Sequence, residues 1–171
     1  MAKQLSSLWV IYTMHQFSDN SRVWIFQSNR ELSPDEIKWA FPKLQGFISE
    51  WQAHGQALAA KVEIRYNRFI VVMVDETNSA ASGCSIDSLH RFMQELEKAL
   101  NIQLFDRLHI AWKDQEKVVS ANRNTFGELL KSGQITSSTI VFNNLVATKK
   151  ELEGNWEVPL SQSWHQQFFQ I

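Results

Sequence analysis

VEIRYNRFIVVMVDETNSAASGCSIDSLHRFMQELEKAL, residues 62–100, is the stretch that decides the fold. Apolar and polar side chains alternate over residues 62–66, which is typical of an edge strand, whereas residues 69–74 are wholly apolar, which predicts a central strand. The turn between them holds Asn67, which tolerates a left-handed backbone. The stretch therefore predicts a β-hairpin, followed by a loop over residues 82–85 that begins a helix.

A helix is expected on each side of this hairpin. Residues 86–100 carry an apolar stripe at helical spacing, so this helix should pack one face on a core. The helix before the hairpin is expected to begin at a capping box formed by Ser33 and Glu36. Its apolar stripe continues through Pro42, which predicts a kink, and the helix is expected to end near His54.

Two more strands complete the predicted core, at residues 23–26 and at residues 107–113, the latter with Leu108, Ile110 and Trp112 facing inward. The resulting order of strand, helix, strand, strand, helix, strand predicts an α+β fold with a ferredoxin-like sheet and both helices on one face. The first and third strands should be central, and the second and fourth should lie at the edges. We also expect the first and third strands to run parallel, which would place the loops that follow them side by side.

The chain is expected to form a single domain over residues 1–171. Its parts would be a loosely attached N-terminal tail at residues 1–13, a core at residues 22–113 and a C-terminal extension at residues 114–171. Met14 is a second candidate, beside Met1, for the start of translation.

The extension is expected to hold strands at residues 117–120 and 139–142, and helices that begin with capping boxes at Thr125 and Thr148. Both faces of the predicted central strands are apolar, although the two core helices cover only one face. Leaving the other face open would forfeit on the order of 10 kcal/mol. The extension should therefore cover that face and leave the chain mainly monomeric, with a sheet-to-sheet homodimer as the alternative. The apolar side chains available for this cover are Phe126, Leu129, Leu130, Trp156, Trp164 and Phe168.

Composition argues against several classes of protein. With 171 residues and a net charge of -1, the chain lacks the basic excess typical of nucleic-acid binders. Its single cysteine excludes an intrachain disulfide and a cysteine-based zinc cluster, and is typical of the reducing cytoplasm. The apolar run at residues 8–12 is too short for a signal peptide or a membrane span. The five histidines form no i, i+4 pair, so neither a metal nor another cofactor is predicted.

Five stretches of the sequence carry a resemblance to a known family. They are VWIFQS at residues 23–28, ASGCSID at 81–87, LFDR at 104–107, VFNNLV at 141–146 and SWH at 163–165. Together they resemble a family of small bacterial proteins often labelled ABC transporter ATPases, and the likeness covers most of residues 22–166. That family has no established activity, so the resemblance implies no catalytic residues.

The ATPase label does not fit the residues of this chain. A Walker A loop needs glycines whose backbone closes around phosphates, and a lysine followed by serine or threonine. Lys131 and Ser132 are the only such pair, and Thr125 and Leu130 stand where the two glycines belong. The sequence therefore argues against an ATPase.

The predicted parallel strands would bring two strand-to-helix loops together and form a candidate site. Two helix N-termini and an arginine favour the binding of an anion, and the same positive field favours the thiolate form of Cys84. The residues expected at this site are Ser28, Asn29 and Arg30 from the first loop and Asp75, Glu76, Ser82, Gly83, Cys84 and Ser85 from the second.

Two functions are compatible with such a site. The favoured one is a non-catalytic module that binds a protein partner or a small anionic ligand at the paired loops. The alternative is a thiol-dependent enzyme with Cys84 as the nucleophile and His165 as the base, although no spacing links these two residues. In a third interpretation Cys84 is simply a small apolar residue packed near Leu89, which would exclude the enzyme.

Overall fold

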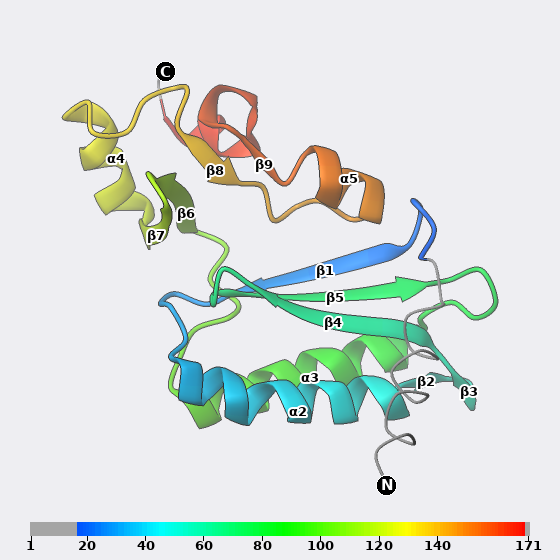
Figure 1. Ribbon diagram of the computed structural model, residues 1–171. Coiled ribbons are helices and arrows are strands. Elements are labelled where there is room, and N and C mark those ends of the chain that lie inside the picture. The colour runs from blue at the N-terminus through cyan, green and yellow to red at the C-terminus, as the bar shows by residue number, and fades with distance from the viewer. Residues whose placement is uncertain (1–16, 170–171) are drawn as a thin grey trace, which may run out of the picture.

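The structure is a computed structural model that describes residues 17–169, so the expected tail at residues 1–13 lies outside the described range. It contains both helices and sheets, which confirms the predicted α+β class. Figure 1 shows one sheet with two long helices against one face and the C-terminal part of the chain against the other. No helix within residues 17–169 is long and apolar enough to cross a membrane.

A three-stranded sheet and two helices form the first part of the fold. The strand order is β1 (Arg22–Gln27), β5 (Phe69–Asp75) and β4 (Ala59–Arg65), and the helices α2 (Pro34–Glu50) and α3 (Gly83–Leu100) lie against one face (Figure 1). The core between the sheet and the helices is fully buried at Leu44, Ile70, Val72, Leu89 and Met93.

Helix α2 begins as predicted and ends earlier than predicted. The Ser33 side chain accepts the backbone N–H of Glu36, and the Glu36 carboxylate accepts the backbone N–H of Ser33, which completes the capping box. The chain leaves the helix after Glu50 and forms a small hairpin of β2 (Gln52–Ala53) and β3 (Gln56–Ala57). The two turn residues, His54 and Gly55, have φ of 51° and 77°, as a tight hairpin turn requires.

The predicted ferredoxin-like sheet does not form, because the fourth strand joins a second sheet. The first and third strands, β1 and β5, are neighbours as expected, but they run antiparallel, with Arg22 opposite Val74 and Gln27 opposite Phe69. In a split strand-helix-strand unit the inserted strand runs against its two parallel neighbours, which are here β1 and β4. The loops that follow β1 and β5 therefore lie at opposite ends of the sheet, and the expectation that they meet is wrong.

The second sheet has the order β7 (Lys117–Asn122), β6 (His109–Asp114), β8 (Ile140–Phe142) and β9 (Glu157–Pro159). Helix α4 (Arg123–Lys131) begins at Asn122, whose side chain accepts the Thr125 N–H, instead of at the predicted Thr125 box. Helix α5 (Lys149–Gly154) begins at the predicted box of Thr148 and Glu151. Two 3₁₀ turns, η1 (Leu160–Gln162) and η2 (Trp164–Phe168), follow β9.

The C-terminal extension covers the second face of the first sheet, as predicted. Val23, Phe69, Val71 and Met73 point to that face and pack in one cluster with Ala111, Phe142, Val146, Leu152 and Trp156. The Phe69 ring lies 4.7 Å from the Phe142 ring and 5.0 Å from the Trp156 ring. Of the six side chains expected to provide this cover only Trp156 belongs to the cluster; Phe126, Leu129 and Leu130 instead pack in a third cluster around Ile110 and Val141.

Candidate functional site

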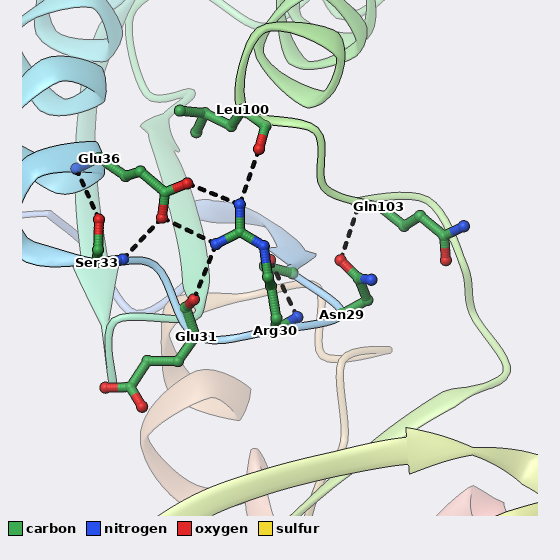
Figure 2. Close-up of polar contacts among 8 residues, drawn as sticks. Asn29, Arg30, Glu31, Ser33, Glu36, Leu100 and Gln103 are labelled. Atoms are coloured by element: carbon green, nitrogen blue, oxygen red, sulfur yellow. Dashed lines mark hydrogen bonds and ion pairs between the residues drawn. The ribbon is translucent and has the colours of Figure 1, made fainter.

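The residues of the first predicted loop are held by their own neighbours. Arg30 donates to both carboxylate oxygens of Glu36, at 2.9 and 2.7 Å, and to the backbone carbonyl of Leu100 at 2.8 Å (Figure 2). Asn29 accepts the backbone N–H of Gln103 at 2.9 Å. These contacts tie the loop, in which Ser28 is completely buried, to the C-terminal end of α3.

The residues of the second predicted loop lie at the other end of the sheet. Asp75 is buried and accepts hydrogen bonds from the backbone N–H and the hydroxyl of Thr77. Glu76 lies 3.8 Å from the guanidinium of Arg22, at the start of β1. Ser82 caps α3 by accepting the Ser85 N–H at 3.2 Å. Of the six residues predicted from this loop, Gly83 and Cys84 are exposed.

The structure therefore does not assemble the anion site that the sequence suggested. The antiparallel pairing of β1 and β5 separates the two helix N-termini, and the guanidinium of Arg30 is bound to Glu36. Cys84 is exposed at the start of α3, so the interpretation that places it in the core near Leu89 is also wrong.

The contact between Arg30 and Glu36 predicts a pH-dependent stability. The hydrogen bonds from Arg30 lower the pKa of Glu36 from 4.5 to about 2, so the contact stabilises the fold above pH 4.5 and is lost as the pH falls toward 2. Because Arg30 is 42% exposed, solvent screening reduces the effect to about 1 kcal/mol. Urea unfolding of the parent, Arg30→Ala, Glu36→Gln and the double variant should show a larger coupling free energy between the two residues at pH 5.5 than at pH 3, where part of it is already lost. Equal coupling at both pH values would contradict the prediction.

A cleft of about 360 Å³ lies along the outer edge of β1, where the two sheets meet. All residues of β1 line it, although their side chains alternate between the two faces of the sheet, so the backbone edge itself forms one wall. The other walls come from His90 of α3, from the loop into β6, from residues 144–147 and from the start of η2.

The outer edge of β1 is paired at its beginning. The backbone N–H of Val23 donates to the carbonyl of Ala147 at 2.9 Å, and Arg22 forms an isolated antiparallel bridge with Thr148. Past Val23, the segment of residues 144–146 follows β1 without backbone hydrogen bonds to it.

The remainder of this edge is open to the cleft. Successive strand residues direct their backbone groups to opposite sides, so Ile25 and Gln27 face outward like Val23. Ser28, the next residue after Gln27, faces the other way, and its N–H donates to the Arg68 carbonyl on the β5 side. Within residues 17–169 the N–H and C=O of Ile25 and the N–H of Gln27 have no hydrogen-bond partner. A free strand edge of this kind is a template for pairing with another extended chain.

Apolar and aromatic side chains surround the open edge. The Phe105 ring lies edge-on to Phe26 at 5.7 Å and to His90 at 6.1 Å, and it is 39% exposed. Leu145, on the other side of the cleft, is 57% exposed. Both are among the most exposed large apolar residues of the described chain, and exposed apolar side chains that gather at one cleft are typical of a binding site.

The charged groups of the cleft are mainly cationic. Arg22 lies over the Trp24 ring, with its guanidinium carbon 4.6 Å from the ring centroid, and it also forms the 3.8 Å ion pair with Glu76. Arg107 lines the cleft as well and is exposed. The one carboxylate that lines the cleft, Asp106, already accepts the backbone N–H of Leu108 at 2.9 Å. The cleft therefore favours an anion over a cation.

Two neighbouring side chains of η2, Trp164 and His165, close one side of the cleft. Burial lowers the pKa of His165 to about 4, so the ring is neutral at physiological pH. Its Nδ1 lies 2.7 Å from the hydroxyl of Ser163, the only hydrogen-bond partner that residues 17–169 provide for the ring. The indole N–H of Trp164 is buried and finds no acceptor in the described part of the chain.

A polar network fixes the end of the cleft near Gln27. The Gln27 amide donates to the His109 carbonyl at 2.8 Å and accepts from the Asn144 amide at 2.8 Å. His109 in turn lies 2.9 Å from the hydroxyl of Ser120, which accepts a hydrogen bond from buried Arg68 at 2.6 Å. Burial, with a further contribution from the charge of Arg68, lowers the pKa of His109. These contacts link the two sheets beside the cleft.

Of the residues that the sequence suggested for the anion site or for the thiol enzyme, only His165 lines this cleft. The exposed edge of β1 was missed because the unbroken apolar run of residues 23–26 indicates a strand with two covered faces and says nothing about its edges. No group of three or more histidine, cysteine, aspartate or glutamate side chains in the described range is placed to hold a metal. The chain matches no protein-family model, no curated protein and no solved structure.

Proposed function

We propose that the protein is a non-catalytic cytoplasmic module that binds an anionic ligand with an apolar body in the cleft beside β1. The observation that carries this proposal is the combination of Arg22 and Arg107 with an aromatic wall in one cleft. Ligand sites typically join an apolar lining to a few fixed polar groups in this way. Four of the five stretches in which the sequence resembles a bacterial family also contribute residues to this cleft, and the exception is the stretch around Cys84.

The alternative, a thiol-dependent enzyme, lacks support in the geometry. A nucleophilic thiol needs a base within hydrogen-bond reach. Cys84 is exposed on α3 and lines neither this cleft nor the smaller pocket of about 230 Å³ beside Phe47 and Trp51. His165 lines the cleft and is paired with Ser163, so the two predicted catalytic residues share no cavity and no hydrogen bond.

The proposal predicts that the cleft distinguishes an anion from a neutral molecule of the same shape. The dye 8-anilinonaphthalene-1-sulfonate should bind the folded protein, and Arg107→Gln should weaken this binding roughly fivefold to tenfold, as expected for the loss of one charge-assisted contact. Fluorescence titration at low salt measures the dissociation constant. The neutral analogue N-phenyl-1-naphthylamine has the same rings without the sulfonate, and its affinity should not change in Arg107→Gln.

Arg91→Gln provides the matched control, since Arg91 is an exposed arginine of α3 that does not line the cleft. Its dissociation constants for both dyes should equal those of the parent. The proposal fails if the sulfonate dye does not bind the folded protein, or if Arg107→Gln and Arg91→Gln affect its binding equally.

A further inference from the structure

We infer that the occupant of the cleft is an extended, carboxylate-bearing peptide segment of a partner protein, which adds as a short strand to the free edge of β1. This inference rests on the proposed function and specifies its ligand. It follows from three features of the cleft, which are its backbone wall, its position between two flanking segments, and the charges and side chains of its walls.

The backbone wall is the first reason. Ile25 presents both its N–H and its C=O to the cleft, and Gln27 presents its N–H, none with a hydrogen-bond partner within residues 17–169. Another strand matches this alternation of donors and acceptors along an edge, and strand addition is a common mode of peptide recognition. A compact anion would satisfy the arginines and leave these backbone groups without partners.

The position of the edge excludes a second copy of the chain as the partner strand. Two copies could pair through β1 only if both edges protruded, but each edge lies between the residues 104–107 and the residues 144–147 that line the cleft. A single extended segment, in contrast, needs no protruding edge on its partner. The segment must also be short, because Ala147 already occupies the edge opposite Val23.

The charges and side chains of the walls indicate the composition of the segment. Side chains of an added strand point alternately to the two sides of its sheet, so one set would meet Phe105 and the other Leu145, and both are apolar and exposed. Arg22 and Arg107 lie toward opposite ends of β1 and are suited to carboxylates near the ends of the segment. An acidic peptide with central apolar residues combines these properties.

The test uses the peptide acetyl-Glu-Val-Ile-Val-Glu-amide and a counterpart in which lysine replaces both glutamates. The acidic peptide should displace the sulfonate dye, and the lysine peptide should do so at least roughly tenfold more weakly. Amide hydrogen exchange by NMR then reports the mode of binding. The Ile25 amide should exchange rapidly in the free protein and slow roughly tenfold or more at saturating peptide, whereas the Trp24 amide, which faces β5, should keep its rate.

A proline variant removes the outward donor without removing a bond to β5. Because the Ile25 N–H faces the cleft, Ile25→Pro should leave the ladder with β5 in place and weaken binding of the acidic peptide roughly tenfold. A cooperative urea transition verifies that the variant folds, and the exchange measurement on the parent tests the inference if it does not. If the peptide fails to displace the dye, or displaces it without protecting the Ile25 amide, the inference is wrong while dye binding still supports the proposed function. If the folded parent protein does not bind the sulfonate dye at all, the proposed function itself is wrong.

Discussion

Deleting residues 114–171 is expected to leave an insoluble or partly unfolded chain, since it uncovers the second face of the first sheet. Val23, Phe69, Val71 and Met73 are all at most 5% exposed, and most of their cover comes from the deleted residues. Each such side chain contributes ~1.5–3 kcal/mol when it is buried. Their combined loss is on the order of 10 kcal/mol, which equals the whole free energy of unfolding of a typical domain. Sedimentation and urea unfolding of the truncated chain measure the outcome.

Two substitutions in the full chain test the same face without a truncation. Phe69→Ala removes a completely buried ring between Phe142 and Trp156 and should lower the free energy of unfolding by ~3–5 kcal/mol. Phe105→Ala is the matched control, because that ring is 39% exposed and its loss should cost far less. A soluble monomer of residues 14–113 that unfolds cooperatively would contradict the arrangement described here.

Local structure was predictable because its signals lie within a few residues. The boxes at Ser33 and Thr148 begin α2 and α5 as expected, since each depends on a side chain three residues away. The hairpin of β4 and β5 was likewise evident from its two apolar patterns and from its turn, where Tyr66 and Asn67 have φ of 52° and 49°. The predicted start of α4 was wrong, because the side chain of Asn122, three residues before Thr125, accepts the Thr125 N–H that the predicted box assigns to Glu128.

The pairing of strands was only partly predictable, because periodicity reports which faces are buried and not which edges meet. Both faces of residues 23–26 are apolar, and the first strand was therefore expected to be central. The structure shows that β1 is an edge strand whose second face is covered by the extension. The alternation in residues 107–113 indicated a strand correctly, but Leu108 is 46% exposed, and Ala111, expected outside, is completely buried because β6 lies in the second sheet.

The wrong strand pairing led to the wrong prediction of the site. The assumed parallel strands placed Arg30 beside Cys84, whereas the observed register places Arg30 beside Leu100 and Cys84 at the far end of the sheet. The cleft joins segments that are distant in the sequence, and it exists because residues 104–107, residues 144–147 and the start of η2 lie along β1. No local pattern contains that information.

Acidification below pH 6.5 is expected to destabilise the protein through His165, whose side chain packs beside the cleft. Burial lowers the pKa of this histidine in the folded state to about 4, against an unfolded value of 6.5. Above pH 6.5 the ring is neutral in both states and the stability is complete. As the pH falls from 6.5 toward 4, only the unfolded chain takes up the proton, so the free energy of unfolding decreases. At pH 5 the expected loss is about 2 kcal/mol.

Urea unfolding of the parent and of His165→Gln at pH 7.5 and pH 5 isolates this effect. The variant should be less stable than the parent at pH 7.5, because glutamine does not reproduce the ring that packs at 4.2 Å on Trp164 and lies within hydrogen-bond distance of Ser163. The difference in free energy of unfolding between the two proteins should shrink by about 2 kcal/mol at pH 5, because protonation of His165 in the unfolded chain destabilises only the parent. Measurement above pH 4.5 avoids the titration of Glu36, whose contribution is lost only at lower pH. A stability difference that is the same at both pH values would show that His165 takes up its proton equally in the folded and unfolded chains, which its burial beside Trp164 argues against.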